Sequence, residues 1–314
     1  MMISGKNVPA RSLAAVVDLG TNAARLAAAS LDASGAFVSE GRWRELIRLG
    51  EGVEETGRIS DGAMARGFET LERFSRLIEG MGADRVDALA TSALREASNG
   101  GEFLAGAREL GIPLRVISAE EEARLALIGV LASMEERPRG ALVFDVGGGS
   151  LELIRSEGGR VSEMASLLAG VVSLSERYLR DIPTPPSQVV SCADDIRAML
   201  GTVPLDAEEV ADLPLIGCGG AVALAWFIRE GYAGDLGING AILGLGEIED
   251  WAGKFAALDM AGRRSLPGFE PGREDVALAG LVVLREVLRW AGQFSLRVST
   301  GGVREGRLIE LLSE

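Results

Sequence analysis

The chain has 314 residues, 47% of them hydrophobic, which is enough to bury sizeable cores and predicts two domains. Its formal net charge of −14 argues against nonspecific binding to nucleic acid or to an anionic membrane, because both need basic protein surface. The sequence contains no histidine, which excludes Ser-His-Asp and Cys-His catalysis and leaves proton transfer to carboxylates, Lys, Tyr or Cys.

The first part of the chain predicts three strands followed by alternating helices and strands. Apolar residues alternate, or recur at helical spacing, between short turns rich in Gly, Asn and Asp. We expect strands at 13–19, 23–31, 36–48, 86–91 and 114–117, with helices at 60–80, 101–110 and 119–134. This order predicts a layer of the α/β class with a mixed sheet.

The pattern then restarts, which predicts a second domain of the same kind. We expect strands at 141–146, 214–217 and 295–299, a hairpin through 157–159, and helices at 171–180, 188–200, 221–230, 274–291 and 303–313. Pro138 breaks the preceding helix, so the boundary lies near 130–140. We assign 1–132 to the first domain and 133–302 to the second, with the helix at 303–314 packing back on the first.

Two similar turns, one in each half, follow apolar strands. Asp18 precedes Gly-Thr-Asn at 20–22, and Asp145 precedes Gly-Gly-Gly-Ser at 147–150. Such turns leave backbone N–H groups and a hydroxyl or amide beside a carboxylate. Two further glycine turns, at 217–220 and 300–302, also end strands, where α/β folds place ligands. Any one of them is an ordinary turn by itself, but together they favour a phosphate site between duplicated domains.

Three glutamates open the helix at 119–134, and their positions separate them. Ser118 and Glu121 have the spacing of a capping box, and Glu120 can pair with Arg124 one turn on. Glu122 is left without a local partner and is a candidate catalytic group. Acidic residues are also favoured in a first helical turn for structural reasons, so both interpretations stay open.

Asp145 and Glu152 flank the second glycine turn, with Ser150 on the same face as Glu152. A carboxylate pair suits a water-rich Mg²⁺ site that also touches substrate phosphates, and a solvated strand edge is the structural alternative. Arginine suits phosphate because its fork matches two oxygens. Arg95, which follows the strand at 86–91, is the first candidate, and Arg25, Arg273 and Arg304 also lie near glycine turns.

Six motifs in this order resemble the exopolyphosphatase/guanosine pentaphosphate phosphatase (Ppx/GppA) family over about residues 13–312. They are Asp-Leu-Gly-Thr-Asn at 18–22, Ala-Thr-Ser-Ala-Leu-Arg-Glu-Ala at 90–97, Glu-Glu-Ala-Arg-Leu at 121–125, Asp-Val-Gly-Gly-Gly-Ser-Leu-Glu at 145–152, Pro-Gly-Arg at 271–273 and Gly-Gly-Val-Arg-Glu-Gly at 301–306. The resemblance implies the actin-like, sugar-kinase-like and Hsp70-like fold of the α/β class, with two RNase H-like domains and a cleft between them. It also implies the short two-domain form of the family.

The same resemblance assigns roles to individual residues. It implies that Glu122 is the catalytic base, that Asp145 and Glu152 are tied to the metal, and that Asn22, Arg95, Gly148, Gly149 and Ser150 contact phosphate. Thr21 and Gly147 belong to the same two turns, and we add them to the phosphate-binding set. The chain departs from the family pattern at Ala23, Ala119, Ala221 and Asn239, which affects secondary ligand contacts only.

The resemblance implies Mg²⁺-dependent hydrolysis, with Mn²⁺ as a second metal that oxygen ligands accept. The leading hypothesis is an exopolyphosphatase acting on inorganic polyphosphate, and the nearest alternative is hydrolysis of the 5′-phosphate of pppGpp. An ADP- or ATP-linked phosphotransferase and a non-catalytic sensor of polyphosphate or an alarmone are more distant alternatives. The partner is thus inorganic polyphosphate or a (p)ppGpp-type nucleotide, and a homodimer is compatible with the sequence.

Nothing in the sequence marks the chain for export. The first apolar run is interrupted by Asp18, and no stretch is long and uncharged enough to cross a bilayer. Cys192 and Cys218 are too few for a disulfide framework or a four-thiolate metal site. We therefore expect a cytoplasmic protein.

Overall fold

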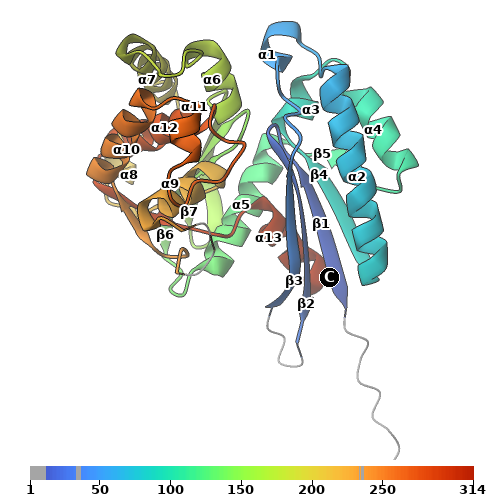
Figure 1. The fold of residues 1–314 in the computed structure, drawn as a ribbon. Coiled ribbons are helices and arrows are strands. Elements are labelled where there is room, and N and C mark those ends of the chain that lie inside the picture. The colour runs from blue at the N-terminus through green and yellow to red at the C-terminus, as the bar shows by residue number, and fades with distance from the viewer. Residues whose placement is uncertain (1–11, 33–36, 233, 235–236) are drawn as a thin grey trace, which may run out of the picture.

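The computed structural model describes residues 12–32, 37–232, 234 and 237–314. They form two lobes, each built on one mixed sheet (Figure 1). The first sheet contains β1 (Leu13–Leu19), β2 (Ala23–Leu31), β3 (Phe37–Leu46), β4 (Arg85–Ala90) and β5 (Leu114–Val116) in the order β3-β2-β1-β4-β5. Its first three strands are antiparallel, whereas β4 and β5 run parallel to β1.

The second sheet repeats this plan. It contains β6 (Gly140–Val146), β7 (Leu151–Glu157), β8 (Arg160–Leu167), β9 (Leu215–Cys218), β10 (Ile242–Gly244) and β11 (Ser295–Val298) in the order β10-β11-β9-β6-β7-β8. Strands β6, β7 and β8 form the antiparallel meander, and β9 and β11 continue in parallel. The predicted class is therefore confirmed: two RNase H-like domains of the actin-like α/β fold.

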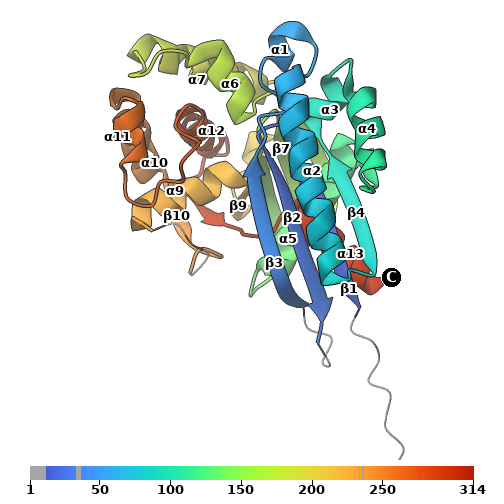
Figure 2. The ribbon, with the colours of Figure 1, turned by 45° about the vertical axis from the view of Figure 1, so that its right-hand side comes forward.

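Helices cover both faces of the first sheet because its strands are apolar on both sides. One face packs against α2 (Asp61–Met81) and α4 (Gly100–Glu109), and the other against α5 (Ala119–Ser133) and α13 (Val303–Ser313). Figure 2 shows α2 lying along the sheet. Helix α2 begins where Ser60 Oγ accepts a hydrogen bond from Ala63 N, and it ends at Gly82 in the left-handed conformation.

Helices α5 and α13 lie between the lobes and join their cores. One hydrophobic cluster contains Val16 of β1, Leu125 of α5, Val143 of β6 and Leu308 of α13. The chain crosses between the lobes twice, from α5 into β6 and from β11 into α13. A separate core lies on the opposite face of the second sheet. That core contains α6 (Val171–Tyr178), α7 (Pro186–Leu200), α9 (Gly220–Glu230), α10 (Leu245–Ala257) and α12 (Ala277–Trp290).

Several elements differ from the sequence-based expectations. We did not predict α1 (Val53–Thr56), α3 (Ser92–Glu96), α8 (Ala207–Val210), α10, α11 (Met260–Arg264) or β10. Strand β3 ends at Leu46 instead of residue 48, and α12 begins at Ala277 instead of residue 274. The loops beyond these two ends contain Arg48 and Asp275, which pair with each other between the lobes. Within the described ranges, no helix combines the length and the apolar character needed to cross a membrane.

Candidate active site

A cavity of about 360 Å³ lies between the two lobes, and residues of all four predicted glycine turns line it. These residues are Gly20, Thr21, Asn22, Gly147, Gly148, Ser150, Gly219, Gly220, Thr300, Gly301 and Gly302. Gly20 N donates to Ala23 O at 3.0 Å and Gly147 N donates to Ser150 O at 2.9 Å, so the two duplicated turns are closed in the same way. All four glycine turns therefore border one cavity.

The two duplicated turns, one from each lobe, also contact each other at the wall of the cavity. A methyl group added at Gly148 would lie 2.8 Å from Thr21 Cβ and 3.0 Å from Asn22 N, so the close approach requires glycine. Thr21 Oγ1 shares a hydrogen bond of 2.8 Å with Ser92 Oγ at the start of α3. Backbone amides from both lobes therefore border one narrow space, an arrangement that suits a phosphate group.

The cavity is lined by six carboxylates: Asp18, Glu122, Asp145, Glu152, Glu270 and Glu305. Three of them, Glu122, Asp145 and Glu152, are close enough for their charges to interact. Asp145 and Glu152 face each other in the β6–β7 register, and Glu122 comes from the first turn of α5. Burial raises the pKa of Asp145 to about 6, and burial together with the neighbouring Asp145 raises the pKa of Glu152 to about 7. Burial, and then the charge of Glu152, raise the pKa of Glu122 well above its ordinary value, against the opposing effect of Arg95.

Most predicted site residues line the cavity, whereas two, Arg95 and Gly149, lie outside its lining. Arg95 Nη1 donates to Glu122 Oε2 at 3.3 Å and to Ile117 O at 3.0 Å, so it fixes the carboxylate from the side. Gly149 lies against Ser92, where an added methyl group would come within 2.4 Å of Ser92 Oγ. Neither Arg95 nor Gly149 is among the cavity-lining residues. Their predicted contacts with phosphate remain a proposal.

The other charged residues in the first turns of α5 have partners different from those we expected. Ser118 Oγ accepts from Glu121 N at 3.2 Å, as a cap does. The carboxylate of Glu121 pairs with Arg115 at 2.8 Å, and it does not complete the capping box. The expected pair of Glu120 with Arg124 is wrong, because Arg124 reaches Glu310 of α13 instead. Arg124 thus pairs with a residue far away in the sequence and not with its neighbour in the helix. Glu122, the third glutamate, lines the cavity.

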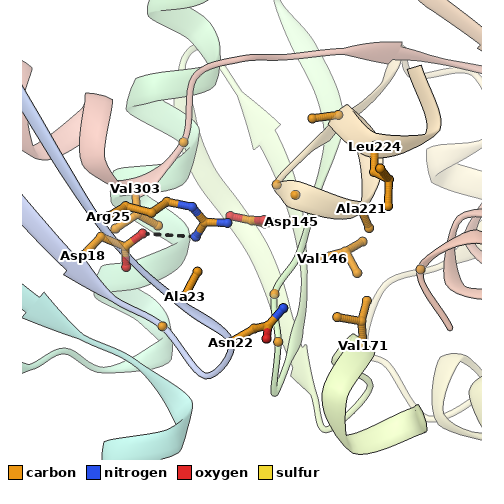
Figure 3. A pocket seen from close by; sticks show the side chains of 18 of the residues that line it. Asp18, Asn22, Ala23, Arg25, Asp145, Val146, Val171, Ala221, Leu224 and Val303 are labelled. Atoms are coloured by element: carbon orange, nitrogen blue, oxygen red, sulfur yellow. Dashed lines mark ion pairs between the residues drawn. The ribbon is translucent and has the colours of Figure 1, made fainter. Parts of the chain in front are cut away.

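The cavity also contains a group of five arginines: Arg25, Arg42, Arg44, Arg273 and Arg304. Arg25 pairs with Asp18 at 3.6 Å and faces Asp145 of the other lobe (Figure 3). Burial, with Arg44 and Arg25 close by, lowers the pKa of Arg273 to about 9. Arg273 Nε and Arg44 Nε and Nη2 are buried without a hydrogen-bond partner. Glu270 pairs with Arg273 at 3.1 Å and with Arg44 at 3.6 Å, so one carboxylate partly neutralises both cations. The buried donors that remain without a hydrogen-bond partner suit a further anion.

Sequence reasoning missed Arg42 and Arg44. They alternate with Trp43 on the edge strand β3, and such a pattern is typical of a solvated strand. The β2–β3 register places Arg44 opposite Arg25, on the same face of the sheet. That pairing of two like charges was the available signal, because like charges directly across a sheet are destabilising unless an anion joins them.

One side of the cavity is apolar. Leu224 and Phe227 of α9, Ile238, and Val276 before α12 line it, next to the glycine turn that contains Gly219. All four apolar side chains are buried. This surface suits a flat organic group attached to phosphates.

The residues present fit a Mg²⁺ ion at Asp145 and Glu152. The buried Glu152 and the half-buried Asp145 both have raised pKa values and repel each other, and a divalent cation between them would remove that repulsion. In the described part of the chain, no group of three or more His, Cys, Asp or Glu side chains is placed to hold a metal. Mg²⁺ keeps several waters and takes one or two carboxylates plus substrate phosphate, so two carboxylates are sufficient for it.

Comparison with known proteins identifies the family and the fold of the chain. A model of the Ppx/GppA phosphatase family matches residues 33–314. The crystal structure of an exopolyphosphatase-like protein is 28% identical, with a TM-score of 0.88, over 96% of this chain and 97% of that one. A Ppx/GppA family member from Aquifex aeolicus is 30% identical over 96% and 97% of the two chains, with a TM-score of 0.78. An exopolyphosphatase from Cytophaga hutchinsonii, 24% identical over 96% and 98%, shares the fold with a TM-score of 0.86.

Proposed function

The chain belongs to the Ppx/GppA phosphatase family, and we propose that it is an exopolyphosphatase that hydrolyses the terminal phosphate of inorganic polyphosphate with Mg²⁺. One observation carries the proposal. A single cavity places an inward-facing carboxylate, Glu122, beside a carboxylate pair, and faces them with two glycine turns and five arginines. Phosphoryl transfer needs positioning and charge neutralisation more than covalent chemistry, and these groups provide both.

In this proposal Glu122 is the general base that takes a proton from the attacking water. A base works best when its pKa lies near the operating pH, and burial moves the pKa of Glu122 in that direction. Arg95 holds the carboxylate in place through its hydrogen bond to Oε2. The glycine turns at 20–22 and 147–150 hold the terminal phosphate between their amides.

Asp145 and Glu152 would hold Mg²⁺, which would supply positive charge near the phosphate that is transferred. The five cavity arginines hold the next phosphates of the chain and keep the polyanion in register. Arg44 and Arg273 are the best placed, because each has a buried donor without a hydrogen-bond partner besides its ion pair with Glu270. Together these charges offset the net negative charge of the protein, which otherwise repels a polyanion.

The test is orthophosphate release from medium-chain polyphosphate with Mg²⁺. We expect Glu122→Gln to lower kcat by about a hundredfold or more, which is the usual contribution of a general base. Glu120→Gln is the matched control, since Glu120 is exposed in the same helical turn. Loss of release in both variants, or in neither, contradicts the assignment of Glu122.

The other outcomes point to the alternatives. No release by the native protein rules out the exopolyphosphatase. Tight binding of polyphosphate or an alarmone without turnover then supports a sensor, whereas loss of polyphosphate only with ADP supports a phosphotransferase.

A second candidate function is hydrolysis of the 5′-phosphate of pppGpp by the same groups. The apolar side of the cavity favours it, because Leu224, Phe227 and Val276 offer a surface on which a guanine ring can rest. A kcat/KM for pppGpp well above that for polyphosphate supports this candidate. A lower value supports the exopolyphosphatase.

A further inference from the structure

Arg48 has an unusual backbone. It is the one non-glycine residue with a positive φ (48°) in the described part of the chain. Left-handed backbone costs energy for a residue with a bulky side chain, and it persists where the surroundings impose it. An outlier of this kind is a reason to look for a function at that residue.

The backbone around Arg48 supports the first glycine turn. Ile47 N and Arg48 N both donate to Asn22 O, at 3.1 and 3.0 Å, and Gly50 N donates to Thr21 O at 2.9 Å. A methyl group at Gly50 would lie 2.1 Å from Thr21 Cγ2, so this segment packs directly against the turn. The conformation of residues 47–50 therefore fixes the carbonyl groups of Thr21 and Asn22, and with them the glycine turn to which these residues belong.

The side chain of Arg48 reaches the other lobe. Its Nη1 and Nη2 donate to the two oxygens of Asp275 at 2.5 and 2.9 Å, and Nη2 also donates to Gly272 O at 3.1 Å. This two-pronged pair is the geometry that an arginine makes best with a carboxylate. Arg273, whose side chain enters the cavity, lies between the two residues that Arg48 holds.

The loop at 271–275 is fastened to the second lobe. The buried Arg263 donates to Glu274 O at 2.7 Å, and Arg264 Nε donates to the Glu274 carboxylate at 2.7 Å. Arg263 also donates to Phe255 O at 3.0 Å, at the end of α10. Because these hydrogen bonds hold the loop to the rest of the second lobe, the Arg48–Asp275 pair positions the whole lobe and not the loop alone.

Two more contacts between the lobes lie beside this pair. Gly52 N donates to Glu176 Oε1 at 3.0 Å, and Arg177 pairs with Glu54 at 3.0 Å. Glu54 belongs to α1, and Glu176 and Arg177 belong to α6. We name these contacts and the Arg48–Asp275 pair the clasp. Figure 1 shows α1 and α6 at the same end of the molecule, away from α5 and α13, which join the lobes.

We propose that Arg48 is a positioning residue, which sets the Thr21–Asn22 turn of one lobe against the Arg273 loop of the other and holds the cleft closed. It contacts no reacting atom itself. The kinetic consequence rests on the proposed function, whereas the closure of the lobes does not. A substrate that binds the closed form loses apparent affinity in proportion to the closed fraction, so weakening the clasp raises KM more than it lowers kcat.

The experiment combines kinetics with an interlobe distance. We expect Arg48→Ala to raise KM for polyphosphate about tenfold and to change kcat less than about twofold. Spin labels at Glu69→Cys on α2 and Val190→Cys on α7 report the distance, since both positions are exposed and Cys192 and Cys218 are buried. Arg48→Ala should shift this distance distribution to longer values.

Controls separate positioning from a general loss of structure. Arg76→Ala removes an exposed arginine paired with Glu72 within α2, and it should move neither readout. Asp275→Ala should match Arg48→Ala, and the double variant should be no worse than either single one. Arg48→Lys keeps the charge without the fork and should give a smaller rise in KM, which covers the case in which Arg48→Ala does not fold.

Unchanged KM and unchanged distances in Arg48→Ala overturn the proposal, and so do fully additive effects of Arg48→Ala and Asp275→Ala. If the native protein releases no orthophosphate, the proposed function fails. The spin-label distances then decide on the clasp alone, because they need no turnover.

Discussion

At the scale of single residues, the contact between the two duplicated turns depends on glycine. Gly148 meets Thr21 Cβ and the backbone N of Asn22, and neither atom is the free end of a flexible side chain. A larger residue must therefore push the two lobes apart at the point where the proposed substrate binds. Substitutions at this position should affect catalysis more than those at any exposed glycine.

We predict that Gly148→Ala lowers kcat/KM for phosphate release by about a hundredfold, because a displacement of about 1 Å costs that much in a positioned site. The free energy of unfolding should fall by about 1–3 kcal/mol from the overpacking. Orthophosphate release and urea unfolding measure the two effects.

Gly101→Ala is the control for this substitution. Gly101 lies in α4, and an added methyl group meets nothing within 4 Å. Its activity should be unchanged, and its stability should rise by roughly 0.5–1 kcal/mol because alanine is the better helix former. Equal activity of Gly148→Ala and Gly101→Ala would show that catalysis does not require the close approach of the two glycine turns.

The sequence singled out Glu122, and its side chain lines the cavity. The cap that set Glu121 apart is present, whereas the pair of Glu120 with Arg124 does not form. Arg42 and Arg44 were missed because their carboxylate partners, Glu305 and Glu270, lie far away in the sequence. For residues with distant partners the local signal is weak, and here it was only the position of Arg44 opposite Arg25 in the β2–β3 register.

At the scale of elements, Asp87 connects three of them. It lies in β4 and accepts hydrogen bonds from Arg115 of β5 at 3.2 Å and from Arg307 of α13 at 2.7 Å. Burial raises the pKa of Asp87, but the hydrogen bonds from Arg115 and Arg307 outweigh it, so the pKa lies below its ordinary value. The ionised carboxylate thus stabilises the attachment of α13 to the first sheet.

We predict that Asp87→Asn lowers the free energy of unfolding by about 2 kcal/mol at pH 7, the usual size for hydrogen bonds to a charged group. The folded pKa is below the unfolded one, so this contribution is complete above the unfolded pKa. It is lost as the pH falls through the folded pKa. The difference between wild type and variant should therefore shrink below about pH 4.

Urea unfolding of both proteins at pH 7, 5 and 3.5 measures this difference. A gap that stays constant down to the lowest pH at which the wild type still folds contradicts the role of the charge.

Most helices and strands could be predicted because their apolar residues repeat cleanly. In α2, Leu71, Phe74 and Ile78 form one buried stripe, and Ser60 and Gly82 mark its ends. Helix α10 was missed although Ile248, Ala252 and Phe255 have helical spacing, because two glycines interrupt it and a glycine-rich stretch precedes it. Packing against α12 stabilises α10, and no property of its own sequence records that.

At the scale of the whole molecule, charge sets a condition on the proposed substrate. The chain carries a net charge of −14, and its cavity holds a carboxylate pair beside five arginines. A polyphosphate that approaches without a counterion meets repulsion from both the protein surface and the pair. Metal should therefore be required for binding as well as for the chemical step.

We predict that EDTA abolishes orthophosphate release and that excess Mg²⁺ restores it. Mg²⁺ alone should also raise the melting temperature of the wild type, by the equivalent of about 2.7 kcal/mol at a hundred times its Kd. Glu152→Gln should lose this rise. Without metal it should be no less stable than the wild type, because it removes a buried charge. Thermal unfolding with and without Mg²⁺ measures this, and an undiminished rise in Glu152→Gln places the metal elsewhere.

The double crossing of the chain between the lobes has a consequence for protein synthesis. The ribosome completes β1, β2 and α5 long before α13, which covers part of the same surface. Until residues 303–313 emerge, apolar residues such as Val16, Ala27 and Leu125 lack their final cover. The first lobe therefore cannot reach its finished form until residues 303–313 have emerged from the ribosome. Until then the newly made chain exposes this apolar surface to chaperones.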